Sequence, residues 1–512
     1  MILVPLFKRI TAGLMAAVIA ASSLVVSSSA DQPYEGYNYD WWSDPVPSQN
    51  GYVVDQVVSG IDLGIGGLNE PNDMFIDDET GDFYLVDTRN NRIVITEETF
   101  DPDKVKVMDT FTYADNYKDA SKAGTTTTLN APMGVYAIHH NDDTLIYIAD
   151  SSNDRVLACY ADGTVWMEYT RPSSDVYEAS VTYNPRKVIV DKALNVYVVI
   201  KSITQGAVVF SQDGTFNGYY GANRVEQTAE VIANAFWKLV LTREQVLKMK
   251  RNVSVEISNL DIDDDGFIYT VTELKSAETD VLKKLNPAGT NVFTNMGLDE
   301  TTFGDVASYY WNGKTYASSI VDVDVDGDGK IHLLDFTTGR VFQYDEECDL
   351  LFIFGGKGSQ KGLFTSPTAV ETYDGKVYVL DGRKNSITSF KSTEFGEIVH
   401  TAIAYFNKGQ YDEAKGPWEE VLRRDSNYWF AYIGLGNAYL NAGEYQTAMD
   451  YFYRNSRAGY NRAFKDFRIE FIRANFNVFM IIILVVVILL IALHYFRKSR
   501  KKKKAAAGGN KK

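Results

Sequence analysis

Six stretches of the sequence repeat one pattern of apolar and turn-forming residues. In residues 323–344, Val323 and Val325 alternate with acidic residues up to an Asp/Gly turn, and a second apolar run then ends at Asp335. Another turn and a third apolar run complete the unit. Period-two alternation between such turns is typical of antiparallel hairpins. Equivalent units begin at Pro71, Pro132, Pro185, Ser258, Ser319 and Pro367. Six small sheets in one chain predict an all-β, six-bladed β-propeller.

The second apolar run of a unit usually ends in an aspartate. This position holds Asp87, Asp150, Asp335 and Asp381, whereas Ile200 and Thr272 replace it in the third and fourth units. One interpretation is catalytic, because strand ends can line the axial channel of a propeller. The other is a structural network in which each Asp caps a turn and pairs with a downstream Arg. Repetition favours the structural interpretation, since a catalytic residue is usually singular.

Three of these units carry a resemblance to NHL-repeat propellers. The matching residues are Tyr84–Asp87 with Asn91–Ile93, Tyr147–Asp150 with Asp154–Val156, and Leu333–Asp335 with Gly339–Val341. The resemblance covers residues 52–392 and extends more loosely to gluconolactonase-like propellers. It implies a six-bladed ring, and it raises the alternative of a hydrolase or lactonase with an axial divalent metal. Because this scaffold hosts many activities, the resemblance selects no function, and no distinctive motif assigns a catalytic or cofactor-binding residue.

Two segments of the predicted propeller fall outside the six units. Residues 52–58 form an apolar strand before the first unit, and we predict that this strand completes the sixth blade and covers its exposed edge. Residues 225–250 have apolar positions at helical spacing, which predicts a helical insertion over one mouth of the ring. This insertion is either a lid over a ligand site or a structural plug. The aromatic-rich segment 31–51 precedes the propeller.

Residues 393–475 have a different period. The sequence Ala404–Ala414 recurs as Ala438–Ala448, with an offset of 34 residues at each matched position. This repeat looks like tetratricopeptide (TPR) helical hairpins. We expect Gly409 and Gly443 to occupy the tight turns, where a side chain is disfavoured. TPR-like hairpins imply a protein partner.

The two ends of the chain predict a single-pass membrane protein. Residues 1–30 have the charged start, apolar run and small-residue end of a secretory signal peptide, with an uncleaved anchor as the alternative. Residues 476–496 form an apolar transmembrane helix, which at about 1.5 Å per residue spans a hydrocarbon core of roughly 30 Å. The tail 497–512 contains nine Lys/Arg and no acid. The positive-inside rule places this tail in the cytoplasm and the preceding residues outside.

The predicted external part is strongly acidic. Without the two cations of the signal peptide and the nine of the tail, 40 Lys/Arg face 67 Asp/Glu, a net charge of −27. Such a surface does not bind nucleic acid through charge. It suits cations or basic partners.

One acidic stretch matches the spacing of a calcium loop. Asp324, Asp326, Asp328 and Asp335 stand at positions one, three, five and twelve, with Gly329 at position six. Calcium loops of this kind lie between helices, whereas strands flank this stretch. Asp and Gly also favour such turns for backbone reasons. Ca²⁺ at these four residues is therefore one hypothesis beside a purely structural turn, and we expect no other cofactor.

These observations favour a binding or scaffold protein over an enzyme. We expect the anchored chain to bind a protein or another ligand through the propeller face and a protein partner through the TPR-like region. The alternatives are the propeller hydrolase with its axial metal and a propeller that serves only as a spacer.

Overall fold

The computed structural model describes residues 32–508 apart from residues 41, 142, 178–180, 224–254, 274–279, 297, 299–300, 306–308, 312–313 and 454. The predicted signal peptide and the predicted helical insertion 225–250 lie outside the described residues. The chain divides into two compact units. The first runs to Tyr39 and from Ser43 to Glu397, and the second comprises Asp40–Trp42 and the chain from Ile398 onward.

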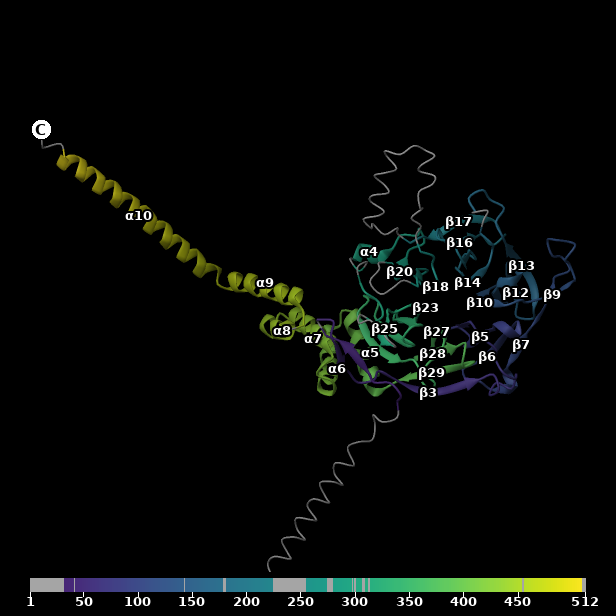
Figure 1. Cartoon of the computed structure of the whole chain (residues 1–512). Coiled ribbons are helices and arrows are strands. Elements are labelled where there is room, and N and C mark those ends of the chain that lie inside the picture. Colours follow the sequence, from purple (N-terminus) through teal and green to yellow (C-terminus); the bar gives the residue numbers. More distant parts are fainter. Residues whose placement is uncertain are drawn as a thin grey trace, which may run out of the picture. The chain divides into compact units, whose positions relative to one another are not determined.

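The described part of the first unit contains six blade sheets, as predicted (Figure 1). Blade 1 consists of β4 (Asp73–Ile76), β5 (Asp82–Asp87), β6 (Arg92–Glu97) and β7 (Lys106–Met108). Blade 2 consists of β10 (Pro132–His140), β11 (Asp143–Asp150), β12 (Arg155–Tyr160) and β13 (Thr164–Thr170). Blade 3 consists of β14 (Pro185–Val190), β15 (Val196–Ile200), β16 (Gly206–Phe210) and β17 (Phe216–Gly221).

The remaining blades follow in chain order. Blade 4 consists of β18 (Asn259–Ile262), β19 (Ile268–Val271) and β20 (Leu282–Leu285). Blade 5 consists of β23 (Ile320–Val325), β24 (Ile331–Asp335), β25 (Arg340–Tyr344) and β26 (Leu350–Gly355). Blade 6 consists of β27 (Pro367–Tyr373), β28 (Lys376–Asp381), β29 (Ser386–Ser392) and the N-terminal strand β3 (Tyr52–Ser59).

Short strands and short helices lie outside the main strands of these blades. The strands β8 (Thr110–Tyr113) and β9 (Thr126–Thr128) extend blade 2, because β8 pairs with β13 in parallel. Two separate hairpins are β1 (Tyr37–Tyr39) with β2 (Pro45–Pro47) and β21 (Tyr309–Trp311) with β22 (Lys314–Tyr316). The short helices are η1 (Thr88–Asn90), η2 (Pro102–Lys104), η3 (Ser151–Asn153) and α4 (Val292–Met296).

The blades close into a ring. Each inner strand contacts the inner strand of the next blade, in the order β4, β10, β14, β18, β23, β27, and β27 contacts β4. The predicted closure is confirmed, because β3 pairs antiparallel with β29 from Tyr52 opposite Ser392 to Ser59 opposite Ser386. The seam also packs against blade 5, since the Tyr52 ring stacks on Phe354 with 4.5 Å between centroids. Closure thus removes the free edge of β29.

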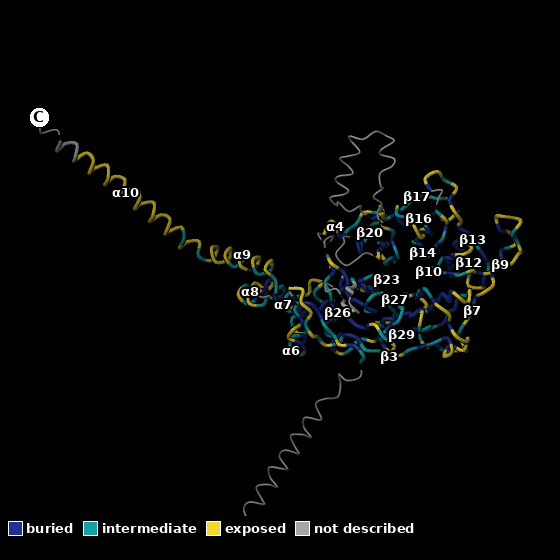
Figure 2. The backbone as a smooth tube through the Cα atoms, in the orientation of Figure 1, coloured by how far each residue is buried: buried dark blue, intermediate teal, exposed yellow. Residues whose placement is uncertain are grey.

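The hydrophobic core lies between the blades, where apolar strands are buried on both faces (Figure 2). The strand β15 is wholly buried and has the sequence VYVVI. β-Branched side chains suit such a strand because they pack well on a pleated surface. The side chains of Val188 and Val190 join the cluster of blades 2 and 3, while Ile189 joins the cluster of blades 3 and 4.

The repeated aspartates accept hydrogen bonds from backbone N–H groups. Asp87, Asp150, Asp335 and Asp381 are completely buried at the ends of their strands. Each accepts a bond of 2.7–2.9 Å from a backbone N–H in the segment that precedes its blade: those of Asn69, Asn130, Ser319 and Thr365. The interpretation of these residues as structural therefore agrees with their geometry.

The Arg partner of these aspartates varies between blades. Arg92 binds Asp87 at 2.7 Å, and Arg155 binds Asp150 at 2.8 Å. In blade 5, Arg340 instead pairs with Asp305. Asp335 accepts the hydroxyl groups of Ser318 and Thr338.

A glycine allows the inner strands of blades 2 and 3 to approach closely. A Cβ atom on Gly134 would lie 2.5 Å from the Arg186 carbonyl oxygen and 2.9 Å from Lys187 Cα. Both atoms belong to the backbone, which yields less readily than a side chain.

We expect Gly134→Ala to lower the free energy of unfolding by about 1–3 kcal/mol, as overpacking does. Gly327→Ala is the control for guanidinium unfolding, because its Cβ would meet no atom within 4 Å. Equal midpoints for the two variants would contradict the close approach.

The described part of the second unit is helical. It contains most of α5 (Glu394–Asn407), followed by α6 (Tyr411–Arg424), α7 (Trp429–Asn441), α8 (Tyr445–Phe452) and α9 (Arg457–Ala474). Successive helices from α6 to α9 pack on one another. Gly409 and Gly443 have φ values of 71° and 78°, as expected for the tight turns. Ala414 and Ala448 are completely buried where the helices cross.

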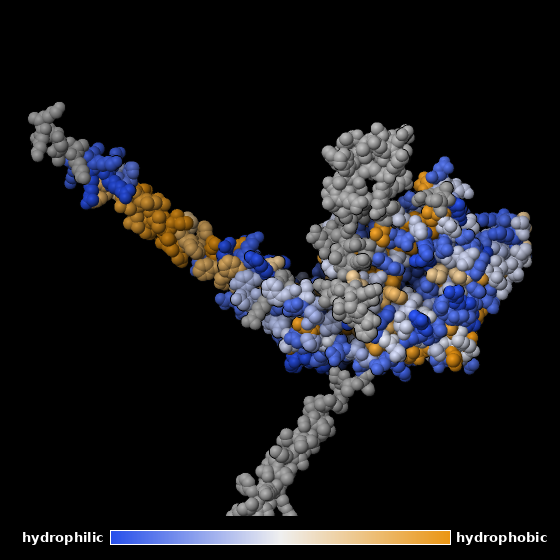
Figure 3. Space-filling model, in the orientation of Figure 1, coloured by the Kyte–Doolittle hydropathy of each residue, from blue (hydrophilic) through white to orange (hydrophobic). Residues whose placement is uncertain are grey.

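The final helix is α10 (Phe476–Gly508). Its segment Phe476–Lys503 is long and apolar enough to cross a membrane, by length and composition. Large apolar side chains are exposed along it, and charged residues follow them (Figure 3).

Candidate functional site

Acidic side chains surround one mouth of the propeller axis. A cavity of about 580 Å³ opens there, and all six inner strands or the turns that follow them contribute to its walls. We define six of its ten acidic residues as the acidic mouth: Asp77, Asp78, Asp261, Asp264, Asp324 and Glu371. Each inner strand runs into a turn at this end, and Asp and Gly are favoured in such turns. The ring therefore gathers acids from blades that are far apart in the sequence.

The floor of this cavity has an aromatic side and an acidic side. The rings of Phe75 and Tyr136 contact each other with 4.6 Å between centroids. Blades 4, 5 and 6 contribute Asp261, Asp324 and Glu371. Aromatic faces and carboxylates both attract cations. The floor is thus suited to a positively charged group.

Hydrogen bonds between blades hold two of these three carboxylates. Asp261 Oδ2 accepts the backbone N–H of Val325 at 3.0 Å, and Asp324 Oδ2 accepts the hydroxyl of Thr372 at 2.7 Å. Glu371 is held less firmly, because its Oε2 accepts the Ile76 N–H at 3.4 Å. The Glu371 residue is only 8% exposed. Its weak bonding leaves this carboxylate available to a ligand.

Burial raises the pKa values of the carboxyl groups on the cavity floor. Burial raises the pKa of Asp261 to about 7. Burial and then the neighbouring acids raise the pKa of Asp324, with Asp261 as the largest contributor, and of Glu371, with Asp324 as the largest. At the rim, burial raises the pKa of Asp78 to about 6. Closely spaced buried carboxylates share protons near neutral pH, and a bound cation would replace those protons.

Deeper along the axis, four polar residues form a layer that we call the polar plug: Asp73, Lys187, Asn259 and Asp322. Lys187 Nζ donates to Asp73 Oδ1 at 2.8 Å, and Asn259 Nδ2 donates to Asp322 Oδ1. Asp73 Oδ2 also accepts the Val135 N–H at 3.0 Å. The plug therefore ties blades 1, 2 and 3 together and blades 4 and 5 together.

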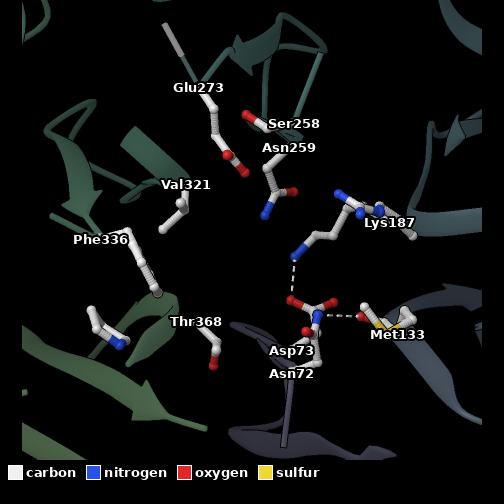
Figure 4. A pocket seen from close by; sticks show the side chains of 12 residues that line it. Asn72, Asp73, Met133, Lys187, Ser258, Asn259, Glu273, Val321, Phe336 and Thr368 are labelled. Carbon is white, nitrogen blue, oxygen red and sulfur yellow. Dashed lines mark hydrogen bonds and ion pairs between the residues drawn. The ribbon is translucent and has the colours of Figure 1, made fainter. Parts of the chain in front are cut away.

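A second, smaller cavity lies beside the polar plug. Its volume is about 240 Å³, and Figure 4 shows Lys187 reaching toward Asp73, with Asn259 and Glu273 on the other side. The ammonium of Lys187 is already bound to a carboxylate, so this cavity offers a mixed rather than an acidic environment. The acidic mouth is therefore the stronger candidate for ligand binding.

A buried histidine connects Asp324 with the seam of the ring. Gln343 Nε2 lies 2.9 Å from His332 Nε2 and 2.8 Å from the Tyr52 hydroxyl. The amide is a donor, so His332 Nε2 is the acceptor and the ring proton is assigned to Nδ1. Nδ1 lies 3.7 Å from Asp324 Oδ2 and has no hydrogen-bond partner among the described residues. Burial lowers the pKa of His332 to about 3, so the ring is neutral.

Two of the four residues predicted to bind Ca²⁺ form an ordinary Asp/Gly turn. Asp326 Oδ1 accepts the N–H groups of Asp328 and Lys330 at 3.0 and 2.9 Å. The Lys330 ammonium lies 3.0 Å from Asp326 Oδ2 and 2.8 Å from Asp328 Oδ2. A lysine in this position competes with a metal ion for the same oxygens.

The other two predicted ligands point to different places. Asp324 faces the acidic mouth, whereas Asp335 lies at the far end of β24, where it accepts the Ser318 hydroxyl at 2.8 Å. The structure therefore does not bring the four aspartates together. In the part of the chain that the structure describes, no three His, Cys, Asp or Glu side chains are arranged to hold a metal ion. Calcium binding stays a prediction that metal titration would test.

The sequence did not reveal the acidic mouth as a site. Its six acids come from blades 1, 4, 5 and 6 and form no local motif. One signal was present, because Phe75, Tyr136 and Glu371 each stand four residues after the proline that opens their unit. Alignment of the units on that proline would have placed these three side chains in one layer of the ring.

No protein-family model matches this sequence, and no curated protein is similar to it in sequence. Solved structures of low identity share the propeller. The virginiamycin B lyase of Staphylococcus aureus is 10% identical and has a TM-score of 0.39, with 67% of this chain and 100% of that chain covered. A luciferin-regenerating enzyme is 11% identical and has a TM-score of 0.37, with 67% and 96% covered. A protein assigned provisionally to the gluconolactonases is 10% identical and has a TM-score of 0.35, with 70% and 98% covered. At these values, the likenesses select no activity for this chain.

Proposed function

We propose that this chain is a membrane-anchored binding protein whose propeller takes up an organic cation in the acidic mouth, on the outer side of the membrane. One observation carries the proposal: the cavity floor sets the Phe75 and Tyr136 rings beside the buried carboxylates of Asp324 and Glu371 and the partly buried carboxylate of Asp261. A cation over an aromatic face is stabilised by about 0.5–2 kcal/mol, with the larger value in a desolvated site. A charge-assisted hydrogen bond to a carboxylate adds about 1.5–3 kcal/mol.

The shape of the cavity limits the ligand. Its volume of about 580 Å³ lies within the range of about 300–1,000 Å³ typical of small-molecule sites. An amine or guanidinium compound of that size, or a single basic side chain of a peptide, fits the chemistry of the floor. The net charge of −27 on the predicted external part would also raise the local concentration of cations.

We infer the location of the protein from α10 and a second binding surface, for a protein partner, from the helices of the second unit. We infer that α10 anchors the chain, that residues 1–30 direct it across the membrane, and that the basic tail stays in the cytoplasm. The helical hairpins α6–α8 are TPR-like, and their 34-residue repeat supports a protein-binding role. A partner bound there would bring the loaded propeller to a complex in the membrane.

The lactonase alternative requires an axial divalent metal. Among the described residues, the acids of the mouth are not arranged in threes that could hold a metal ion. The aromatic side of the floor favours an organic cation over a metal ion as the ligand. Binding without catalysis is therefore the function that the geometry supports best.

Calorimetric titration of the full-length protein in nanodiscs tests this function. The probes are spermidine, arginine methyl ester and tetramethylammonium, with neutral glycerol as the negative control. We expect at least one of the cations to bind, and Glu371→Gln to weaken its binding about tenfold, since a lost charge-assisted bond is about 1.4 kcal/mol or more.

The matched control is Asp328→Asn, which removes an acid from an exposed turn of blade 5. This variant should bind as tightly as the wild type. Equal weakening by both substitutions would show that only the diffuse negative charge attracts the probe, and failure of all three cations to bind would contradict the proposed site.

A further inference from the structure

The helix α9 carries an aromatic stripe that the second unit covers only at its first residue, Tyr460, which packs against the cluster around Phe452. The stripe consists of Tyr460, Phe464, Phe467 and Phe471, whose spacing of four, three and four residues places them on one helix face. Phe464 is 43% exposed and Phe471 is 53% exposed. Neighbouring rings stack at 6.5 Å for Tyr460 with Phe464 and at 6.4 Å for Phe467 with Phe471. An exposed row of aromatic residues is unfavourable in water.

A different face of α9 packs against the preceding helix. Ala463 is completely buried, and a Cβ atom on Gly459 would lie 2.6 Å from a ring carbon of Phe452 in α8. The small residues thus make the contact with α8. Packing within the unit therefore does not explain the two exposed aromatic residues of the stripe, Phe464 and Phe471.

Basic residues accompany the stripe. Arg462, Lys465, Arg468 and Arg473 are all exposed, and Arg468 lies over the Phe464 ring at 5.5 Å from its centroid. The helix has five Arg/Lys, including Arg457, and two acids, a net charge of +3. This contrasts with the acidic character of the rest of the external part. Aromatic and basic residues together are the composition of helices that lie at a membrane surface.

The position of α9 in the chain supplies the independent argument. The helix ends at Ala474, and α10 begins at Phe476. Only Asn475 separates α9 from the segment that is long and apolar enough to cross a membrane, and the last residue of the stripe, Phe471, lies five positions before that segment. The Phe471 ring even contacts Phe479 of α10, with 6.2 Å between centroids. When α10 spans the bilayer, the last turn of α9 is held at the bilayer surface.

We propose that α9 lies in the outer headgroup region of the membrane, with the aromatic stripe at the acyl boundary and the basic residues on lipid phosphates. The inference rests on the proposed anchoring by α10. Tyr and Phe rings stabilise helices at this depth, and each Lys or Arg near an anionic surface adds about 1 kcal/mol. The helix then fixes the second unit against the lipid surface rather than leaving it on a free tether.

Spin-label accessibility in the full-length protein tests this placement. Single cysteines replace Phe464 in the stripe, Glu470 off the stripe, and Ile483 within α10, and each is labelled in nanodiscs that contain phosphatidylcholine and phosphatidylglycerol. The unsubstituted protein reports any labelling of the buried Cys159 and Cys348. Oxygen partitions into lipid, whereas a nickel chelate stays in water.

We expect the label at position 464 to favour oxygen severalfold over the nickel chelate and the label at position 470 to favour the nickel chelate. If the label at 483 lies in the bilayer while the labels at 464 and 470 are equally exposed to nickel, the surface placement of α9 is wrong and the anchor stands. If the label at 483 is exposed to nickel, the anchor itself is wrong. Strong dipolar broadening between labels at 464 would show that a second copy of the chain covers the stripe, which overturns the lipid assignment.

Discussion

Arg155→Met should lower the free energy of unfolding by about 3–5 kcal/mol, the usual cost of breaking a buried ion pair by removing one partner. The guanidinium is the hub of blade 2. It binds Asp150 at 2.8 Å and Glu168 at 2.6 Å, and it donates to the Thr128 carbonyl at 3.0 Å. The substitution leaves the buried Asp150 without its cation and leaves Glu168 with only the partly exposed Lys122. Guanidinium unfolding of the full-length protein in detergent, followed by near-ultraviolet circular dichroism, measures the change.

Arg89→Met is the matched control for this experiment. Arg89 binds Glu70 at 2.8 Å in the equivalent turn of blade 1, but the two side chains are 64% and 65% exposed. Exposed ion pairs contribute about 0–1 kcal/mol, so the loss should stay below about 1 kcal/mol. If both variants lose the same stability, the network around Arg155 contributes no more than a surface pair.

The second large effect is expected for Lys187→Met in the polar plug. Lys187 is buried and binds Asp73, and its charge also acts on Asp322. The substitution leaves these carboxylates uncompensated, which should cost about 3–5 kcal/mol near neutral pH. Methionine retains most of the volume of the lysine stem, so the loss reports on charge more than on packing.

The pH dependence of this loss has a definite sign. Burial raises the pKa of Asp322 from 3.8 to about 7 although Lys187 opposes the shift. An acid with a raised pKa contributes stability that is complete below about pH 4 and is lost as the pH rises through about 7. Without Lys187, this pKa rises further, so the variant should lose more stability at pH 8 than at pH 5. An equal loss at both pH values would show that Lys187 does not compensate the acids.

The repeats were predictable because each blade is a local unit. Alternating apolar residues and Asp/Gly turns specify hairpins within about 25 residues, and these signals survive in units without the closing aspartate. Even the long-range pairing of β3 with β29 was predicted, since a lone apolar strand and an incomplete blade require each other. The strand Tyr52–Ser59 differs from the predicted 52–58 by one residue.

The candidate site was not predictable in the same way. The calcium spacing of Asp324, Asp326 and Asp328 suggested a local site, but alternation along a strand and its turn directs these side chains to different surroundings. Conversely, Phe75 and Glu371 lie almost 300 residues apart in the sequence and meet only through ring closure. A site assembled from separate blades has no sequence motif, because each contribution looks like an ordinary strand or turn position.

The seam between β3 and β29 has a consequence for the synthesis of the protein. Gln56 and Ser389 are bonded in the finished ring but lie 333 positions apart in the chain. During synthesis, β3 is made early and must remain unpaired until nearly the whole propeller has followed. Contacts between distant segments form slowly, and unpaired strand edges favour aggregation while they wait. The blade that contains the first propeller strand to be made is therefore the last to be completed, and a chaperone that shields residues 52–59 would act at the most vulnerable step of folding.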